Sequence, residues 1–452
     1  MDIKTIVLAA GKGTRMKSAL PKVLHCIAGK PMLQWVVESV SSFKGETVVV
    51  CGHGAELVKD QLAQPSLKWV EQTEQLGTGH AVQQTIQLID DADKVLILYG
   101  DVPLIETETL RTLLQQVNKN TMGLLTVNLD DPTGYGRILR ENKKVQRIVE
   151  HKDANETERA VNEVNTGILA VTGSSLKKWL SQLENDNAQE EYYLTDIIEM
   201  AVNDGVDVKT VQPKSEFEVK GVNARKELNE LERYYQRKNA ESLMEQGVTL
   251  ADANRIDVRG KLVLTGSDIF IDSNVIFEGT VILGEGVNIG SNCVIRDAQI
   301  ANNVTIKSHC VLEDCEVSDD SVIGPFARLR PGAELDENVR IGNFVEVKKS
   351  KVGQGSKINH LSYIGDADIG KNVNIGAGTI TCNYDGVNKF KTIIEDNVFI
   401  GSDTQLVAPV TIAKGATIGA GTTLTKNAPE EELTLSRAKQ LTLKGWKKPV
   451  KE

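Results

Sequence analysis

A glycine-rich turn near the start of the sequence has the composition of a phosphate-binding segment. The stretch LAAGKGTRM, Leu8–Met16, follows directly on a short apolar run. Gly11 and Gly13 have no side chain to keep backbone amides away from a phosphate, and Arg15 can neutralise its charge. Met16 stands where a dinucleotide fingerprint needs its third glycine, and the spacing is not that of a Walker loop. The turn therefore indicates a phosphate-binding segment, although a plain strand–helix turn would use the same glycines.

Further polar residues stand where predicted strands of the first half end. Ligands of open α/β sheets bind beyond the carboxyl ends of the strands. Asp101 closes the run VLILYGD as a lone carboxylate, which suits Mg²⁺, and Gly77 and Thr78 open a helix whose free amides favour anions. Taken singly, each such residue is equally well explained as a turn or cap residue. The set comprises Gln72, Gly77, Thr78, Asp101, Gly136, Glu150, Asn165 and Asn223.

Aliphatic residues recur with a period of six through most of the second half, between Ile289 and Leu424. A hexapeptide period sustained over this length predicts a β-helix, in which each coil buries its aliphatic residues on the next. The repeat is interrupted between Ile375 and Ile394 by the insertion TCNYDGVNKFK. Because a solenoid needs no such loop for stability, the insertion indicates function.

Two basic residues share one column of the predicted β-helix. Leu329 and Val347 are three hexads apart, so they stack in adjacent coils, and Arg330 and Lys348 stack with them, about 4.8 Å apart. Two like cations at that spacing repel unless they share an anion. A sugar phosphate is the natural candidate, and a pair of solvated surface cations is the alternative.

His360 lies within one coil of that column. One hexad is short at this point, so the coil advances 17 residues and places Asn343 beneath His360 and Glu346 beneath Tyr363. The following coil also advances 17 residues, which puts the small Ala377 over His360. A histidine beside a basic column, a carboxylate and the insertion is a candidate general base. A histidine that only fills a corner of the coil is the alternative.

The elements that must position these residues differ between the two halves of the chain. Strand-like and helical stretches alternate in the first half, which predicts a mostly parallel sheet covered on both faces. A segment rich in helix formers precedes Gly247 and predicts a long connecting helix. The expected strands are 5–10, 47–51 and 95–99, and the expected helices are 31–43, 55–62, 80–89 and 224–246. The predicted domains are 1–226, a helical linker at 227–247, and 248–452.

Composition limits the class of partner. The 452 residues carry a formal net charge of −10, so the chain is not built to hold a nucleic-acid backbone. Six scattered cysteines without a C-x-x-C pair argue against structural zinc and a disulfide framework, and fit a reducing compartment. The N-terminal apolar run is too short for a signal peptide, and no run reaches the ~18 apolar residues of a membrane helix. We expect a cytoplasmic protein without membrane insertion.

The motif L-A-A-G-x-G-T-R-M, with Pro21-Lys22 downstream, is similar to that of the nucleotide-sugar pyrophosphorylases. Through its whole length the chain resembles the bifunctional bacterial family that combines N-acetylglucosamine-1-phosphate uridyltransferase with glucosamine-1-phosphate acetyltransferase. The resemblance implies an α/β Rossmann-like nucleotidyltransferase domain, a connecting helix, and a left-handed parallel β-helix of hexapeptide repeats. It also implies Mg²⁺ as cofactor, UTP and acetyl-CoA as co-substrates of the two sugar phosphates, and a homotrimer whose acetyltransferase sites are built from neighbouring subunits.

The same resemblance assigns residues to roles in both halves. In the acetyltransferase, it makes His360 the general base toward the glucosamine-1-phosphate amine. Contacts to UTP or UDP-N-acetylglucosamine are implied for Leu8, Ala9, Ala10, Gly11, Arg15, Lys22, Gln72, Gly77, Thr78, Tyr99, Gly100, Asp101, Gly136, Glu150, Asn165 and Asn223, with Mg²⁺ held by Asp101 and Asn223. The sugar phosphate is assigned to Arg330, Lys348, Tyr363 and Asn374, and acetyl-CoA to Ala377, Asn383, Tyr384, Ser402, Ala420 and Arg437.

Three other functions remain to be weighed. A single-activity pyrophosphorylase with an oligomerising β-helix would need neither His360 nor the loop at 382–393. A sugar-nucleotide-binding regulator would not need Arg15, Lys22, Asp101 and Asn223 together. A nicotinamide oxidoreductase is disfavoured because the third glycine is missing.

Overall fold

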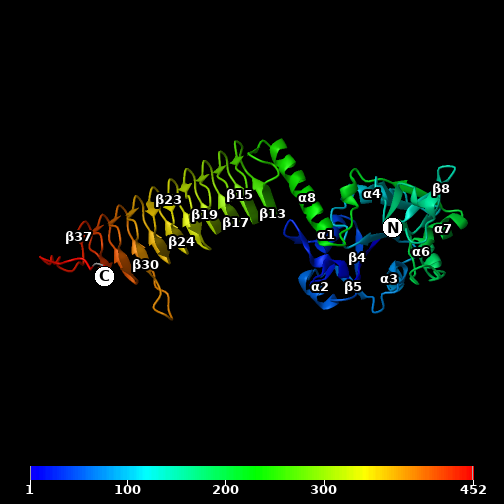
Figure 1. Ribbon diagram of the computed structural model, residues 1–452, viewed down its shortest axis with the longest axis horizontal. Coiled ribbons are helices and arrows are strands. Elements are labelled where there is room, and N and C mark those ends of the chain that lie inside the picture. Colours follow the sequence, from blue (N-terminus) through cyan, green and yellow to red (C-terminus); the bar gives the residue numbers. More distant parts are fainter. Residues whose placement is uncertain (1, 450, 452) are drawn as a thin grey trace. The chain divides into compact units, whose positions relative to one another are not determined.

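The computed structural model describes residues 2–449 and 451, and divides them into two compact units that meet between Tyr235 and Gln236. The first unit is an α/β domain and the second is a parallel β-solenoid (Figure 1). The two predicted classes of architecture are both confirmed.

The first unit is built on a mostly parallel sheet in which β1 (Ile3–Ala9) lies between β4 (Gly45–Cys51) and β6 (Lys94–Tyr99). Ala9 pairs with Cys51, and Leu8 pairs with Tyr99. The carboxyl ends of these strands therefore meet at one edge, which is where the predicted polar residues follow them. The sheet also contains β5 (Leu67–Glu71), β7 (Thr121–Asn128), β10 (Glu163–Thr172) and β11 (Asp207–Val211), with β10 antiparallel to its neighbours, and the attached hairpin β8 (Arg137–Glu141) and β9 (Lys144–Val149).

Helices cover both faces of this sheet, as the alternation of β1 side chains requires. Val7 and Ala9 enter one buried cluster with α1, α2 and α4, whereas Ile6 and Leu8 enter another with α3, α6 and α7. The short strands β2 and β3 (Cys26–Ile27, Lys30–Pro31) form a separate hairpin. The helices are α1 (Met32–Ser39), α2 (Ala55–Gln61), α3 (Thr78–Gln83), α4 (Thr107–Gln115), α5 (Glu156–Arg159), α6 (Gly173–Leu180) and α7 (Asp196–Asn203).

Two predicted helices are shorter than expected. The helix expected at 31–43 is α1, with Pro31 as its N-cap, and it ends at Ser39, whose hydroxyl donates to the Val36 carbonyl at 2.8 Å. The helix expected at 80–89 ends at Gln83, and the Thr85 hydroxyl donates to the Val82 carbonyl at 2.7 Å. Hydroxyl groups that bond back to the helix backbone compete with its continuation.

The long helix α8 (Arg225–Glu245) lies where the sequence predicts a connecting helix. Its first part contributes Leu231 to a buried cluster of the first unit, with Met16 and Val222. Its last part contributes Ala240 and Leu243 to the core of the solenoid. The helix is therefore an integral part of both cores rather than a bare linker.

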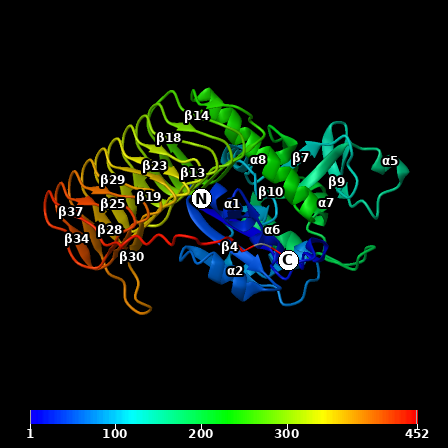
Figure 2. The ribbon, with the colours of Figure 1, turned by 60° about the vertical axis from the view of Figure 1, so that its left-hand side comes forward.

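In the solenoid, each strand pairs in parallel with the equivalent strand of the next coil (Figure 2). Ile306, Ile323, Ile341 and Ile358 stack in one such column and are at most 1% exposed. The pairing advances by 18 residues from Arg328 to Glu346 and by 17 from Glu346 to Tyr363. The coil arithmetic drawn from the hexads is thus confirmed.

The solenoid strands fall into two parallel sheets. One contains β12 (Thr249–Leu250), β14 (Phe270–Ile271), β16 (Asn288–Ile289), β18 (Thr305–Ile306), β20 (Val322–Ile323), β23 (Arg340–Asn343), β26 (Lys357–His360), β29 (Asn374–Ile375), β32 (Phe399–Ile400), β35 (Thr417–Ile418) and β37 (Leu433–Thr434). The other contains β13 (Ile256–Leu264), β15 (Val275–Leu283), β17 (Val294–Ile300), β19 (Val311–Val317), β21 (Arg328–Leu329), β22 (Ala333–Leu335), β24 (Glu346–Lys348), β25 (Ser350–Val352), β27 (Tyr363–Gly365), β28 (Ala367–Ile369), β30 (Ile380–Cys382), β31 (Thr392–Ile394), β33 (Gln405–Val407), β34 (Val410–Ile412) and β36 (Thr423–Leu424).

The insertion leaves the solenoid between β30 and β31 as a projecting loop (orange, beside β30 in Figure 1). An isolated bridge between Tyr384 and Lys389 closes it on itself. Among the described residues, no helix is long and apolar enough to cross a membrane.

Neighbouring isoleucines on β31 provide a test of the solenoid core. Ile394 is 1% exposed and stacks between Ile369 and Ile412, whereas Ile393 is 40% exposed. We expect Ile394→Ala to lower the free energy of unfolding by about 2–5 kcal/mol, because it leaves a cavity. Ile393→Ala is the matched control and should cost under about 1 kcal/mol. Urea unfolding followed by circular dichroism measures both, and equal losses would contradict the assignment of inward and outward faces.

Candidate active sites

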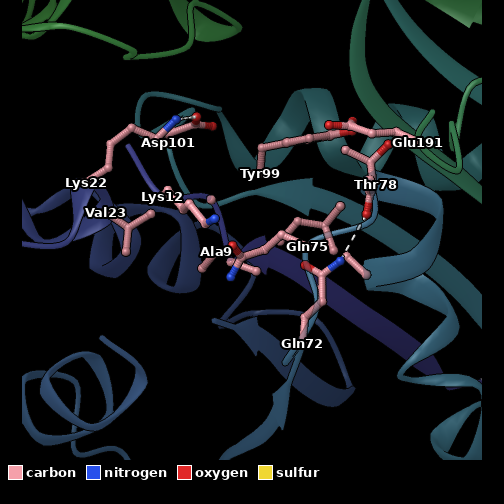
Figure 3. A pocket seen from close by; sticks show the side chains of 15 residues that line it. Ala9, Lys12, Lys22, Val23, Gln72, Gln75, Thr78, Tyr99, Asp101 and Glu191 are labelled. Carbon is pink, nitrogen blue, oxygen red and sulfur yellow. Dashed lines mark hydrogen bonds and ion pairs between the residues drawn. The ribbon is translucent and has the colours of Figure 1, made fainter. Parts of the chain in front are cut away.

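The first candidate site is a cavity of about 480 Å³ at the carboxyl edge of the α/β sheet (Figure 3). The ends of β1 and β6, the segment after β5 and the start of α3 supply its walls. Ten of the residues that the sequence assigned to the nucleotide line it: Leu8, Ala9, Ala10, Gly11, Lys22, Gln72, Gly77, Thr78, Tyr99 and Asp101.

Gln72 fixes the glycine turn that precedes α3. Its side chain is 3% exposed, and its Nε2 donates to the Gly77 carbonyl and lies within hydrogen-bonding distance of His80 Nδ1, both at 3.1 Å. Gly77 has φ of +109°, and a Cβ there would lie 2.6 Å from the Tyr192 carbonyl oxygen. A side chain at residue 77 would therefore collide with the neighbouring backbone, so the glycine is a steric requirement of this wall.

A cationic and an acidic group meet at one end of the cavity. The Lys22 ammonium pairs with the Asp101 carboxylate, and Figure 3 marks this contact with a dashed line. Lys22 Nζ also lies 3.4 Å from Asn223 Oδ1, which accepts a hydrogen bond of 2.8 Å from Arg15. Residues 15, 22, 101 and 223 therefore come together, although more than 200 positions separate the first from the last.

The residues around Lys22 fit a hard divalent cation. Asp101 offers a carboxylate oxygen and Asn223 an amide oxygen, and both oxygens face the Lys22 ammonium. Oxygen ligands of this kind suit Mg²⁺, which usually takes one or two protein ligands and completes its shell with phosphate and water. No cluster of three or more His, Cys, Asp or Glu residues suited to a metal occurs in the described part of the chain. The donor set therefore fits a cation that is shared with a phosphorylated substrate.

A second cavity, of about 530 Å³, shares Tyr99 and Asp101 with the first. Arg15, Asn223 and the turn at 133–135 also line it. Gly136, Glu150 and Asn165 stand directly behind this turn. The Gly136 carbonyl accepts a hydrogen bond of 2.8 Å from the Asn165 amide, and a Cβ on Gly136 would lie 3.4 Å from Glu150 Oε1.

Some lining residues were missed, and four assigned residues line neither cavity: Gly100, Gly136, Glu150 and Asn165. Gly100 is packed against Leu33, Ala9 and Val23. Lys12 and Gln75 could have been found from their places beside Gly11 and Gln72. Glu191 gives no local signal, because only the folding of the segment before α7 brings it to α3. The missed residues of the first cavity are Lys12, Val23, Gln75, Ala81 and Glu191.

Burial raises the pKa values of acidic groups around this site. Burial, with the charges of Glu150 and Asp101, raises the pKa of Tyr99 well above its usual range, so its hydroxyl stays protonated. Burial also raises the pKa of Glu150, against a 3.2 Å hydrogen bond from Thr195. Burial and the nearby Glu150 raise the pKa of Asp196 from 3.8 to about 6.

The second candidate site lies on the solenoid around His360. The pairing of β23 with β26 puts Asn343 beside His360, and Asn343 Oδ1 lies 3.0 Å from His360 Nδ1. An amide oxygen only accepts hydrogen bonds, so Nδ1 carries the proton and Nε2 presents its lone pair. His360 is exposed and, with Asn343, lines a cavity of about 560 Å³.

A column of alternating charges leads to the two stacked cations. Arg259, Glu278, Arg296 and Glu313 pair in successive coils, and adjacent members form ion pairs, such as Arg296 with Glu313 at 3.1 Å. The next positions are Arg330 and Lys348, so the alternation breaks at Lys348. A column that otherwise pairs opposite charges thus ends with two cations side by side.

At this end of the column the charge of Asp366 acts on Lys348, but no acidic side chain is bonded to it in the described part of the chain. Glu346 bonds Arg330 at 2.7 Å, which the sequence did not predict. The cations Lys389, from the insertion, and Arg330 lower the pKa of Lys348 below its usual value. Lys389 is therefore a further residue of the site that periodicity could not reveal.

The side chains of Tyr363 and Asn383 cover the next position of the same column. Lys348 pairs with Gly365, where a Cβ would lie 2.5 Å from Tyr363 Oη and 2.9 Å from Asn383 Nδ2. Asn383 also bonds Asp366. Tyr384, by contrast, is 58% exposed on the insertion, and Asn374 lies on the other sheet, between Lys357 and Phe399.

Small residues continue the His360 column toward the C-terminus. The pairing of β26, β29, β32 and β35 places Ala377, Ser402 and Ala420 in successive coils after His360. The Arg437 guanidinium reaches the end of this row, where a Cβ on Gly419 would lie 2.9 Å from it. Two assigned residues lie apart from their assigned groups: Asn374 is on the other sheet from Arg330, Lys348 and Tyr363, and Asn383 lies beside Tyr363 rather than in the row of Ala377.

The raised pKa of Asp196 should make the stability of the folded protein depend on pH. Because the pKa of Asp196 is raised to about 6, the folded state holds its proton between 3.8 and 6, where the unfolded chain has lost it. Stability therefore falls as pH rises through that window. We expect the thermal midpoint of Asp196→Asn, relative to the unmodified protein, to increase steadily from about pH 4 to about pH 7. Calorimetry at several pH values measures this difference, and a pH-independent difference would contradict the raised pKa.

Comparison with known proteins identifies a family for part of each unit. The family model described as MobA-like NTP transferase domain matches residues 5–163. The model described as bacterial transferase hexapeptide (six repeats) matches residues 391–426. Among solved structures, a UDP-glucose pyrophosphorylase complexed with UDP-glucose is 19% identical and covers 53% of this chain and 100% of that one, with a TM-score of 0.44. That likeness is too low to bear on the chemistry.

The fold, the sites and the two family models define a nucleotidyltransferase joined to a hexapeptide-repeat transferase. "Bifunctional protein GlmU" of Azoarcus sp. (strain BH72) is 57% identical over 452 residues and is matched over 100% of both chains. The protein of the same name from Ralstonia nicotianae (strain ATCC BAA-1114 / GMI1000) is 57% identical over 449 residues, covering 99% of this chain and 98% of that one. The chain belongs to the GlmU family of bifunctional proteins.

Proposed function

We propose that the chain makes UDP-N-acetylglucosamine in two steps on its two units. The solenoid acetylates glucosamine-1-phosphate with acetyl-CoA. The α/β unit then transfers UMP from UTP to N-acetylglucosamine-1-phosphate and releases pyrophosphate. The membership of the GlmU family over the full chain supports both halves of this reaction.

The observation that carries the acetyltransferase is the bond of 3.0 Å between His360 Nδ1 and Asn343. It leaves Nε2 as the base that accepts a proton when the sugar amine attacks the thioester carbon. A new C–N bond forms, the C–S bond breaks, and the CoA sulfur leaves as thiolate or, once protonated, as thiol. The phosphate of the same sugar is assigned to Arg330 and Lys348, where the charge column lacks an anion, with Tyr363 beside them.

Acetyl-CoA is assigned to the row that runs from His360 toward the C-terminus. Ala377, Ser402 and Ala420 are small, so they leave room along the coils for an extended ligand. Arg437 of the C-terminal segment reaches the end of this row, beside Gly419. Asn383 and Tyr384 would approach the ligand from the insertion. Asn374 lies on the His360 sheet and would approach the sugar from that side.

In the α/β unit, the phosphate oxygen of N-acetylglucosamine-1-phosphate attacks the α-phosphorus of UTP, and the bond to the β-phosphate breaks. No covalent enzyme intermediate is required, so catalysis depends on positioning and on charge neutralisation. Gln72 and the turn at 77–78 hold the nucleotide, and Arg15 and Lys22 face its phosphates. Asp101 and Asn223 would hold Mg²⁺, which neutralises phosphate charge when bound.

A ladder of exposed apolar side chains along one corner of the solenoid supports self-association. The rings of His309, Phe326 and Phe344 stack with centroids 4.8 and 5.3 Å apart, although Phe326 and Phe344 are 48% and 55% exposed. Leu361 extends the ladder and is 63% exposed. Exposed contiguous apolar surface of this kind marks an interface. We assign it to neighbouring copies in a homotrimer, which would complete sites on both flanks of the corner.

The substrates and the thiols point to the cytoplasm. UTP and acetyl-CoA are intracellular metabolites, and the described cysteines are all free. Partners are small molecules, and the net charge of −10 does not favour a nucleic acid.

We expect His360→Ala to lower the acetyltransferase turnover number by about 10²–10⁴, the usual worth of a positioned base, and to leave uridylyl transfer unchanged. Asp101→Ala is the mirror control, since it should abolish uridylyl transfer and spare acetylation. Mass spectrometry measures the two steps separately: acetylation from glucosamine-1-phosphate and acetyl-CoA, and uridylyl transfer from N-acetylglucosamine-1-phosphate, UTP and Mg²⁺. Loss of both activities in either folded variant would refute two independent sites.

A further inference from the structure

Arg137 is a buried cation that forms no ion pair in the described part of the chain, although the charge of Asp131 acts on it. Its side chain is 1% exposed, at the start of β8 and directly after Gly136. Within the described part of the chain, its hydrogen bonds go to the carbonyls of Tyr135 and Arg159, the latter at 3.4 Å, and to His151 Nδ1 at 3.3 Å. Burial, followed by the charge of Arg159, lowers the pKa of Arg137 below its usual value. Enclosing an unpaired guanidinium costs free energy, so this placement calls for an explanation.

The bonds of Arg137 tie three separate segments to one point. Tyr135 belongs to the turn before β8, Arg159 ends α5, and His151 follows β9. The planar fork of a guanidinium can hold several acceptors in fixed directions, which an ammonium cannot do. The result is a rigid support for the turn at 133–136.

That turn forms part of the wall of the second cavity. Thr133, Gly134 and Tyr135 line it together with Asp101 and Asn223. The turn has three other backbone contacts among the described residues: the Tyr135 amide donates to the Pro132 carbonyl at 3.2 Å, the Thr133 amide donates to Asp131 Oδ1 at 3.1 Å, and the Gly136 carbonyl accepts from Asn165. Gly134 has φ of +86°, a conformation that residues with a side chain rarely adopt. The side chain of Arg137 adds a restraint at the end of this wall, beside Gly136.

We propose that Arg137 is a positioning residue for the uridyltransferase, which holds the turn at 133–136 in the conformation that accepts the sugar phosphate. The proposal rests on the proposed function and adds a residue to it. Arg137 touches neither substrate nor reacting atoms. It acts through the Tyr135 carbonyl and the position of Gly136, so it should govern the binding of the sugar phosphate rather than that of UTP.

Arg137→Lys and Arg137→Met test this assignment. Lysine keeps the charge but cannot reach three acceptors, and methionine keeps part of the volume without the charge. We expect each to raise the KM for N-acetylglucosamine-1-phosphate about tenfold or more, with the KM for UTP within about twofold and kcat reduced much less than kcat/KM. If Arg137→Met does not fold, Arg137→Lys decides.

Arg140→Met is the matched control. Arg140 lies on the same strand but is exposed, and it bonds Glu163 at 2.6 and 2.7 Å. It should lower the thermal midpoint without changing the KM for the sugar phosphate. An unchanged KM in a folded Arg137→Lys variant, with only a lower thermal midpoint, would overturn the proposal. Absence of uridylyl transfer in the unmodified protein would instead overturn the proposed function, so the two failures are distinguishable.

Discussion

Hydrogen bonding between parallel strands is the constraint on which both sites depend. It fixes which residues of neighbouring strands lie side by side, and therefore which side chains meet. In the α/β unit, it aligns the carboxyl ends of β1, β4 and β6 at one edge. In the solenoid, it repeats every coil at about 4.8 Å, so that a single residue type placed every 17 or 18 positions becomes a continuous column.

Because of this regularity, charged side chains at equivalent positions of adjacent coils lie next to one another along the solenoid. Opposite charges in adjacent coils stabilise one another, and the column from Arg259 to Glu313 follows that rule. Two cations in succession, Arg330 and Lys348, break it, and Lys389 of the insertion adds a third positive group. These cations lie one corner of the coil away from His360. The hydrogen bond to Asn343 sets the tautomer of His360. The stacked cations and a base with a free lone pair thus occur on adjacent coils.

Periodic features could be predicted from the sequence, and features of tertiary folding could not. The stacking of Asn343 beneath His360 and of Glu346 beneath Tyr363 followed from counting hexads, because the solenoid converts sequence distance into spatial distance. The ends of α1 and α3 did not, since Ser39 and Thr85 hydroxyls bond back to the helix. Glu191, Lys389 and Arg137 carry no periodic or motif signal: Glu191 and Lys389 reach their sites through the folding of loops, and Arg137 through the pairing of β8. The convergence of Arg15, Lys22, Asp101 and Asn223 was suggested by their places at strand ends, but the ion pair between Lys22 and Asp101 was not.

The central claim is that the interrupted charge column creates an anion site. Lys348→Glu restores the alternation beyond Arg330, and Lys349→Glu changes the adjacent exposed lysine outside the column. Isothermal titration of glucosamine-1-phosphate into the full-length protein compares them directly, with light scattering to check the assembly. The account predicts that Lys348→Glu weakens binding by at least about tenfold, without a fall in thermal midpoint, and that Lys349→Glu leaves binding within about threefold. Binding by a folded Lys348→Glu variant as tight as that of the unmodified protein would contradict it.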